Sequence, residues 1–514
     1  MRHAPFLGHL LDDYEAGADA GMMQAPFVAI GAKQRSAEEI RARAAGLAEA
    51  LAALGVGRGD AVALIARNGF HFFEVETAMR SLDGFLVPLN WHLTATEAGY
   101  ILRDCRARVI IGEDDLLAAI NAEIPASAKQ VSLEKETAGR LSYEVLAATP
   151  PKIARRGSGL ESSIIYTSGT TGHPKGVRRL PKSTDEIAAR RHALNLLYPS
   201  RPGARALVTG PQYHLFSLAV SMTYFGAGAD VVVMERFDAE SFLATIAEHR
   251  VTHTHLVPTM MVRLLRLPED VRRRYDVSSL EFVIHSGAPC AEEIKRGLID
   301  WFGPVISESY GSTETGAVTL IGSRDWLARP GSVGRPYATG EVRIYDKAGE
   351  RLTSGGIGEI HTIMHGTPDF TYHGNDDARQ RIGRDGMIAS GDIGWLDAEG
   401  YLFVCDRIAD MVISGGVNIY PAEIEAAILS HPAVVDAAVF GIPDPEFGES
   451  IAVHLTVAVP LVEEELRCYL RERLASYKVP KRMVFEAELP RLENGKILKR
   501  ALREPYWAGR QRRV

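Results

Sequence analysis

A loop rich in glycine and hydroxyl side chains, within residues 164–177, carries the strongest local signal for chemistry. A short apolar run ends at Thr167, and the loop that follows closes with Lys175. Glycines let the backbone turn tightly enough for its N–H groups to point at an anion, while hydroxyls and a lysine add donors and charge. The spacing differs from the GxxxxGK[ST] pattern of P-loop NTPases. The segment therefore predicts a phosphate-binding loop of another kind, with a plain surface turn as the alternative.

Three charged residues further along the chain stand beside or near glycines. Glu314 lies three residues after Gly311, Asp392 follows Gly391, and Lys496 follows Asn494-Gly495. A carboxylate can hold Mg²⁺ or accept from hydroxyls, and a lysine can neutralise a phosphate. Each residue also has an ordinary interpretation, as an exposed acid, a turn-capping aspartate or a hairpin lysine. Taken singly, the ordinary interpretation is the better one for each.

Taken together, five segments resemble the motifs of the adenylate-forming superfamily, in the same order along the chain. This superfamily includes acyl- and aryl-CoA synthetases, peptide-synthetase adenylation domains and firefly luciferase. The matching segments are residues 164–177, 310–315, 390–394 with 406–407, 414–423 and 490–497. The chain is most similar to a free-standing fatty-acyl-CoA synthetase. The resemblance implies a large N-terminal domain, a small mobile C-terminal domain and ATP-dependent activation of a carboxylate.

The resemblance also implies which residues bind ATP. The phosphate-binding loop would hold the β- and γ-phosphates, Thr313 would touch the α-phosphate, and Glu314 would hold Mg²⁺. Asp392 would accept hydrogen bonds from the ribose, and Arg407 would add a donor. The other ATP-binding residues implied are Thr167, Ser168, Gly169, Thr170, Thr171, Gly172, Lys175, Gly287, Ala288, Pro289, Tyr310 and Gly311.

The remaining implied roles concern the acid, CoA and the catalytic step. Lys496 would bridge the attacking carboxylate and the α-phosphate, and His214 would form a gate beside the acyl group. The implied catalytic residues are therefore Lys496, Thr313, Glu314 and His214. The acyl pocket would be lined by His214, Phe216, Ser286, Gly287 and Gly311, and the CoA tunnel by Ser414, Gly415 and Gly416.

The hinge between the two domains departs from the family pattern. Two residues after Arg407 the family usually has Asp or Lys, and this chain has Ala409. Alanine offers little polar anchoring, which makes the energetics of domain rotation uncertain but leaves the chemistry unchanged.

The pattern of apolar runs predicts an α/β fold. Short β-branched runs alternate with helical segments through the first 400 residues, which is typical of parallel sheets covered by helices. A smaller antiparallel region is expected over residues 331–359, where hairpin-like turns occur. Beyond residue 406 a compact α+β unit is expected. We therefore predict an N-terminal domain over residues 1–405 with the ATP and acyl pockets, and a mobile C-terminal domain over 406–514 that carries the catalytic lysine.

The composition of the chain limits the classes of partner that the protein is expected to bind. The 514 residues hold 58 Lys plus Arg against 65 Asp plus Glu, a net charge of −7, which argues against a nucleic-acid-binding module. We expect no signal peptide and no membrane span, because the most apolar stretch, residues 217–234, is broken by glycines and an aspartate. The four cysteines lie far apart and predict neither a zinc site nor a disulfide framework. A cytoplasmic enzyme is expected; its oligomeric state is left open, with a homodimer among the alternatives.

The expected function is an ATP-dependent, Mg²⁺-dependent acyl-CoA synthetase that forms an acyl-AMP and passes the acyl group to CoA. The segments 213–222, 286–289 and 307–311 offer apolar and small residues with no evident counter-ion, so we expect an apolar monocarboxylic acid of medium to long chain or a bulky ring-containing acid. An α-amino acid is disfavoured because Tyr213 to Phe216 provides no acid for its ammonium. The alternatives are an aryl-CoA ligase, an acyl-AMP ligase that loads a separate carrier protein, and a luciferase-like oxidative enzyme. Little sequence follows Lys496, which favours CoA over a fused carrier domain.

Overall fold

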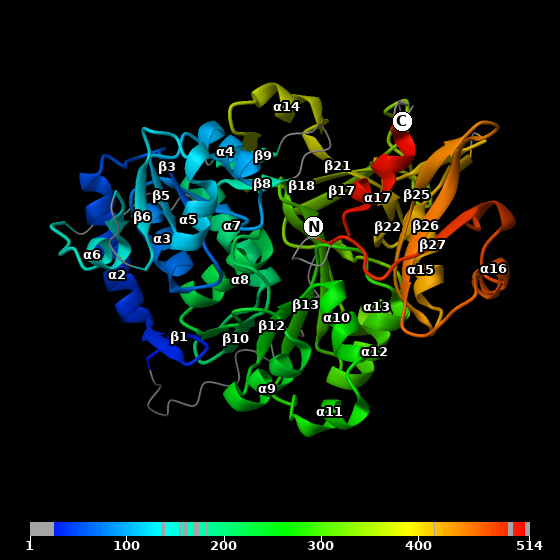
Figure 1. Cartoon of the computed structure of the whole chain (residues 1–514), viewed down its shortest axis with the longest axis horizontal. Coiled ribbons are helices and arrows are strands. Elements are labelled where there is room, and N and C mark those ends of the chain that lie inside the picture. Colours follow the sequence, from blue (N-terminus) through cyan, green and yellow to red (C-terminus); the bar gives the residue numbers. More distant parts are fainter. Residues whose placement is uncertain are drawn as a thin grey trace.

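A nine-stranded sheet forms the centre of the computed structural model (Figure 1). The structure describes residues 25–134, 139–153, 157, 163–167, 174–180, 183–415, 417–491 and 497–508. The order of the strands is β16-β15-β14-β13-β12-β10-β11-β1-β2, parallel from β14 to β1 and antiparallel at both ends. The bounds are β1 (Phe27–Ile30), β2 (Lys33–Ser36), β10 (Arg205–Val208), β11 (Asp230–Val233), β12 (His253–Leu256), β13 (Phe282–His285), β14 (Ile306–Ser312), β15 (Gly316–Gly322) and β16 (Arg335–Pro336).

Helices cover both faces of this sheet and bury two apolar clusters. One face packs against α7 (Thr184–Leu197) and α8 (Leu215–Gly226). The other packs against α9 (Ala239–His249), α10 (Pro258–Leu265) and α12 (Glu292–Phe302), with the short α11 (Glu269–Arg274) and α13 (Ser323–Ala328) nearby. Strands buried on both faces read as continuous apolar runs, which is why the sequence pattern identified them.

A second sheet, of five parallel strands, precedes the first in the chain. Its order is β4-β3-β5-β6-β7, and helices again cover both faces. The bounds are β3 (Ala61–Ile65), β4 (Phe85–Leu89), β5 (Val109–Gly112), β6 (Lys129–Ser132) and β7 (Leu141–Ser142), with α2 (Ala37–Ala53), α3 (Phe70–Ser81), α4 (Ala95–Asp104), α5 (Asp114–Ile120), η1 (Asn121–Glu123) and α6 (Tyr143–Ala147). The predicted parallel α/β architecture is confirmed by these two sheets.

Two antiparallel sheets complete the large N-terminal part. The three-stranded one pairs β19 (Asp369–Tyr372), β9 (Lys175–Leu180) and β8 (Ile165–Thr167), with α14 (Asp376–Arg381) beside it. The five-stranded one holds β17 (Gly340–Tyr345), β18 (Gly358–Met364), β20 (Gly383–Arg384), β21 (Met387–Leu396) and β22 (Leu402–Arg407). The antiparallel region expected over 331–359 is confirmed and extends to residue 407.

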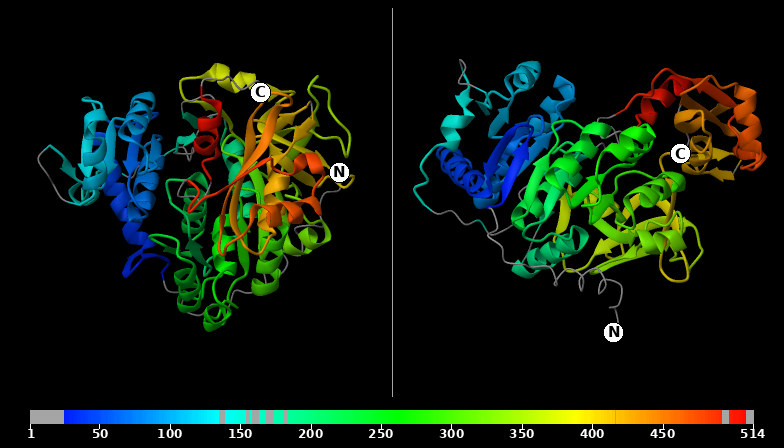
Figure 2. Two further views of the ribbon diagram at one scale, coloured as in Figure 1. Left: turned by 45° about the vertical axis from the view of Figure 1, so that its right-hand side comes forward. Right: turned by 90° about the horizontal axis from the view of Figure 1, so that it is seen from below.

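The elements after residue 411 form a small α+β lobe with its own core, orange to red in the right-hand view of Figure 2. Its sheet pairs β24-β23-β26-β25 antiparallel and adds β27 in parallel. The bounds are β23 (Val412–Ser414), β24 (Val417–Ile419), β25 (Val434–Asp444), β26 (Gly448–Val457), β27 (Arg482–Phe485), α15 (Pro421–Leu429), α16 (Glu463–Arg471), η2 (Ser476–Lys478) and α17 (Lys499–Trp507). Within the described residues no helix is long and apolar enough to cross a membrane.

A buried carboxylate ties three helices to an edge strand of the nine-stranded sheet. Glu74 of α3 has no exposed surface and accepts from Arg35 (2.7 Å), Arg43 (2.8 Å) and the hydroxyl of Tyr143 (2.7 Å). These partners come from β2, α2 and α6. A carboxylate in this position compensates two partly buried guanidinium groups, whose other carboxylate partners, Glu39 and Glu144, are more exposed.

We expect Glu74→Gln to lower the free energy of unfolding by about 3 kcal/mol, because Arg35 and Arg43 lose the buried carboxylate that they share and keep only the more exposed Glu39 and Glu144 as counter-charges. Urea unfolding followed by circular dichroism measures this change. Glu38→Gln, at an exposed position of the neighbouring helix α2, is the control and should change stability by less than about 0.5 kcal/mol. Equal urea midpoints for the two variants would contradict the structural role of Glu74.

Candidate active site

Several of the predicted site residues lie at one edge of the nine-stranded sheet. Ser286 follows β13, Tyr310 and Gly311 lie near the carboxyl end of β14, and His214 follows β10. The carboxyl ends of parallel strands meet at the same edge, which is where open α/β sheets bind ligands. The fold therefore brings together residues that are about 100 positions apart in the chain.

The phosphate-binding loop begins and ends on a β hairpin beside this edge. Thr167 on β8 lies directly opposite Lys175 on β9. The predicted residues Ser168, Gly169, Thr170, Thr171 and Gly172 lie outside the described residues. The Lys175 ammonium stands over the ring of Tyr372, 5.2 Å from its centroid. Both residues line a small cavity of about 130 Å³, which also borders Asp104 and His373.

Glu314 is held in place by residues that the sequence analysis did not single out. The hydroxyl of Tyr372 donates to Oε1 of Glu314 at 2.9 Å, so that one tyrosine contacts both Lys175 and Glu314. Arg179 on β9 donates to the carbonyl of Thr313 at 2.8 Å. Burial lowers the pKa of Arg179 to about 10, against the opposing effect of Glu314 and Asp369, and the group stays charged at neutral pH. The sequence held one signal for Arg179. It follows the buried Val177 by two residues on β9, so its side chain lies on the same, buried face of the strand.

The predicted ribose pair is formed across two antiparallel strands. Asp392 on β21 lies opposite Arg407 on β22, and the Arg407 Nε is 3.4 Å from Oδ1 of Asp392. The hydroxyl of Tyr310 donates to Oδ2 at 2.7 Å. Burial, reinforced by the Asp392 charge, raises the pKa of Tyr310 well above its ordinary value, so the hydroxyl remains a donor. Tyr310 thereby links the central sheet to the antiparallel sheet that carries Asp392.

Two glycines of the predicted site meet a local backbone requirement. A Cβ on Gly311 would collide with the carbonyl oxygen of Gly316, because β14 and β15 approach closely there. Gly287 has φ of +89°, a conformation that glycine adopts without steric cost. Ser286 beside it donates to the carbonyl of Ser309 at 2.7 Å. Ala288 and Pro289 follow in the exposed loop before α12.

His214 stands at the N-terminus of α8, next to the apolar cluster under this helix. Its ring packs 4.4 Å from the ring of Tyr213, and its Nε2 is shielded from solvent without a hydrogen-bond partner among the described residues. Burial lowers the pKa of His214 to about 4. Phe216, two residues further along, packs edge-on against His255 with centroids 4.9 Å apart. These rings form an apolar surface at the edge of the sheet.

The small lobe meets the large part of the chain at α10 and at the predicted hinge. Arg266 at the end of α10 donates to the carbonyl of Val435 at 2.5 Å. Ala409 lies in an exposed turn, and its carbonyl accepts from Arg503 of α17 at 3.4 Å. An antiparallel β-bridge joins Arg491 and Ile497. Lys496 lies outside the described residues.

The predicted CoA tunnel residues lie on a hairpin of the small lobe. Ser414 is the last residue of β23 and Gly415 follows it in the turn to β24; the amide of Gly415 donates to the carbonyl of Phe447 at 2.8 Å. Gly416 lies outside the described residues. Gly415 has φ of +57°, which suits a tight turn.

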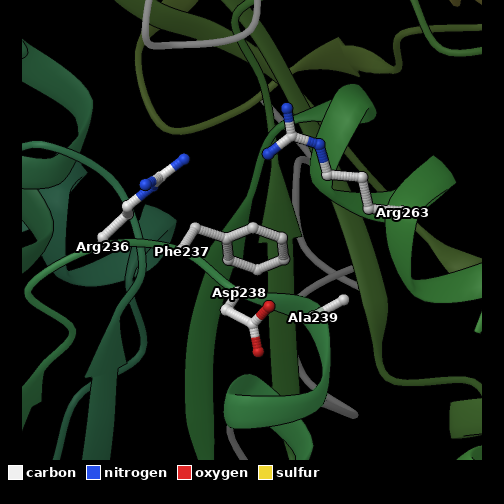
Figure 3. A pocket seen from close by; sticks show the side chains of 5 residues that line it. All are labelled: Arg236, Phe237, Asp238, Ala239 and Arg263. Carbon is white, nitrogen blue, oxygen red and sulfur yellow. The ribbon is translucent and has the colours of Figure 1, made fainter.

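A larger cavity, of about 500 Å³, opens beside α10 (Figure 3). Residues 236–239, which connect β11 to α9, form one side, and Arg263 of α10 forms the other. Figure 3 shows the Arg236 and Arg263 side chains reaching into the space above the ring of Phe237. Both arginines are exposed. Sequence reasoning missed this cavity, since two arginines 27 positions apart form no motif.

Comparison with known proteins decides the family. Residues 17–367 match the AMP-binding enzyme family, and residues 423–496 match the AMP-binding enzyme C-terminal domain. The chain belongs to the AMP-binding enzyme family. It is 31% identical to the fatty acid–[acyl-carrier-protein] ligase ScoC of Streptomyces coeruleorubidus over 95% of both chains, and 34% identical to a feruloyl-CoA synthase of Amycolatopsis over 91% of this chain and 93% of that protein. Among solved structures it resembles ATP-bound MatB of Rhodopseudomonas palustris, with a TM-score of 0.82 and 29% identity over 97% and 98% of the two chains.

We expect His214 to remain neutral down to about pH 4, which ¹⁵N NMR of the imidazole measures directly. The unfolded chain binds the same proton near pH 6.5 and therefore holds more protons between these two values. The contribution of His214 to stability is thus present above pH 6.5 and is lost as the pH falls toward 4. Loss of one resonance in His214→Phe assigns the signal. Protonation of that signal near pH 6.5 would contradict the burial of this group.

Proposed function

We propose that the chain is an ATP-dependent acyl-CoA synthetase for an apolar or ring-containing monocarboxylic acid. The observation that carries this proposal is the convergence of three groups at one edge of the central sheet: the Lys175–Tyr372–Glu314 cluster, the Asp392–Arg407 pair and the apolar surface at His214. The named relatives, ligases of fatty acids and of ferulate, support it.

ATP would lie across this edge. Asp392 would accept from the ribose hydroxyls, beside Arg407 as a further donor. Thr167 and Lys175 would contact the β- and γ-phosphates, together with the loop between them. Glu314 fits Mg²⁺, a hard cation that binds through one or two carboxylates and phosphate oxygens, and Tyr372 fixes the position of that carboxylate. When bound, the ion would neutralise phosphate charge.

The first half-reaction joins the acid to AMP. A carboxylate oxygen forms a bond to the α-phosphorus as the bond to the β-phosphate oxygen breaks, and pyrophosphate leaves. Negative charge grows on the leaving group, so fixed cations and donors lower the barrier. Lys175 and the Thr313 hydroxyl would supply these on the large domain, and Lys496 would supply a second cation from the small one.

The second half-reaction transfers the acyl group to a thiol. The C–S bond forms as the acyl–phosphate oxygen bond breaks, AMP leaves and the thiol proton is released. We propose that the domain of residues 406–514 rotates about Ala409 between the two steps, relative to the domain of residues 1–405. The Arg503–Ala409 and Arg266–Val435 hydrogen bonds involve flexible side chains, which can exchange partners during such a rotation.

The cavity between Arg236 and Arg263 would receive the phosphates of CoA. Guanidinium groups bind phosphate oxygens through two parallel hydrogen bonds. The cavity adjoins α10, the helix that the small lobe contacts through Arg266. This arrangement favours CoA as the acceptor over a separate carrier protein, the acceptor indicated by the name of one relative.

The test is pyrophosphate release over short, medium, long, aromatic and polycyclic acids, with and without CoA. We expect acid-dependent release and CoA-dependent formation of AMP and thioester. Lys496→Ala should reduce adenylation by about 10²–10³-fold and largely spare thioester formation from a supplied acyl-adenylate. Lys347→Ala, at an exposed turn, is the control. Absence of pyrophosphate release with every acid would refute the proposed function, and equal loss in both half-reactions would refute the role of Lys496.

Arg236→Gln and Arg263→Gln should each raise the KM for CoA about tenfold, because each removes a charge-assisted contact worth about 1.4 kcal/mol or more. The rate of pyrophosphate release without CoA should stay unchanged. Steady-state kinetics with CoA measures the effect, and Arg324→Gln, at an exposed position of α13, is the control. An unchanged KM for CoA in both variants would exclude this cavity as the phosphate-binding site.

A further inference from the structure

The tyrosine directly before the phosphate-binding loop is fixed by packing on the five-stranded sheet. Tyr166 lies on β8 next to Thr167, and its ring packs against the apolar cluster between α4, α5 and that sheet. The backbone just before it is attached to the same sheet, because the amide of Ile164 donates to the carbonyl of Leu86 on β4 at 2.9 Å. Since β4 is an edge strand, the hairpin that carries the phosphate-binding loop begins at the edge of the five-stranded sheet.

A glycine opposite Tyr166 leaves room for its ring. Gly176 on β9 faces Tyr166 across the hairpin, one register position from the pair formed by Thr167 and Lys175. A Cβ on Gly176 would stand 2.8 Å from Cζ of Tyr166 and 2.9 Å from Cγ2 of Ile164, closer than such atoms approach one another. The ring of Tyr166 therefore lies across the hairpin, beside both described ends of the phosphate-binding loop.

The hydroxyl of Tyr166 reaches the last residue of α4. It donates to Oδ2 of Asp104 at 2.5 Å. Burial raises the pKa of Tyr166 well above its ordinary value, and nearby acids, Asp104 among them, act in the same direction, so the hydroxyl stays a donor. A hydrogen bond from a hydroxyl to a carboxylate is roughly twice as strong as one between neutral groups. This bond therefore attaches the hairpin firmly to α4.

The bond stands beside the small cavity at Lys175. Asp104 of α4 lines this cavity of about 130 Å³, together with Lys175 and Tyr372. On the other side of the hairpin site, Tyr372 contacts both Lys175 and Glu314. Atoms that face a cavity lack packing partners there, so apolar packing contributes less to the attachment at this point and a directional hydrogen bond contributes more.

We propose that Tyr166 and Asp104 are positioning residues for the β- and γ-phosphates of ATP. This inference rests on the proposed function, in which Thr167 and Lys175 contact those phosphates, and deepens it. Because Thr167 and Lys175 lie opposite one another, a shift of the hairpin away from α4 would displace both together. The ribose pair lies on β21 and β22 and would stay in place. The bond therefore acts on the triphosphate end of the nucleotide and not on the nucleoside.

The test compares MgATP with AMP, which lacks the β- and γ-phosphates. Isothermal titration calorimetry without any acid measures the two Kd values. Tyr166→Phe and Asp104→Ala should each raise the Kd for MgATP about five- to tenfold, because each removes the same charge-assisted hydrogen bond, and should leave the Kd for AMP unchanged. The double variant should bind MgATP no more weakly than the single variants. Asp104→Asn, whose amide oxygen can still accept from the hydroxyl, should keep most of the affinity.

A remote bond of the same kind provides the control. The hydroxyl of Tyr275, at the end of α11, donates to Glu240 of α9 at 2.8 Å, and Tyr275→Phe should leave both Kd values unchanged. Thioester formation from a supplied acyl-adenylate, which carries no β- or γ-phosphate, should be unchanged in every variant.

Three results would overturn the proposal: an unchanged Kd for MgATP in both single variants, an equal rise for MgATP and AMP, or additive effects in the double variant. The proposed function has a separate test, because absence of pyrophosphate release with every acid in the unmodified protein would contradict that function whatever the two Kd values are.

Discussion

The site depends on one aromatic side chain that lies between two opposite charges. Tyr372 presents its ring to the Lys175 ammonium and its hydroxyl to the Glu314 carboxylate. The three residues come from β9, the end of β14 and β19, which belong to two different sheets. This contact holds the phosphate-binding hairpin against the acidic turn after β14, and each of these segments lies at the end of its strand. Arg179 strengthens the junction by holding the backbone at Thr313.

A second tyrosine, Tyr310, also joins two sheets, on the side of the site where the ribose would lie. Tyr310 lies on β14 of the central sheet, one residue before Gly311, which permits the close approach of β15. The hydroxyl of Tyr310 donates to Asp392 on the antiparallel sheet. The nucleotide would therefore lie over a surface in which three sheets are joined by hydrogen bonds between side chains. Such bonds are short and directional, and they fix positions that apolar packing alone would leave adjustable.

The arginines around the site differ in their degree of burial. Arg179 is buried and holds a backbone carbonyl, whereas Arg236 and Arg263 are exposed beside a cavity. Desolvation makes a cation more selective for a charged or strongly accepting partner, and exposure makes it tolerant of many partners. The same residue type is thereby suited both to holding a backbone and to attracting phosphates.

The sequence by itself determined the parallel α/β class, several strands of both parallel sheets, the small α+β lobe and the family resemblance, because apolar periodicity and short glycine-rich motifs are local properties of the chain. It also indicated Lys175, Glu314, Asp392 and Arg407 as one set. Only the tertiary structure revealed Tyr372, Arg179 and the cavity at Arg236 and Arg263. Each of these depends on residues far apart in the chain, and a side chain that is ordinary in its own segment gains its role only when folding brings a distant partner within reach.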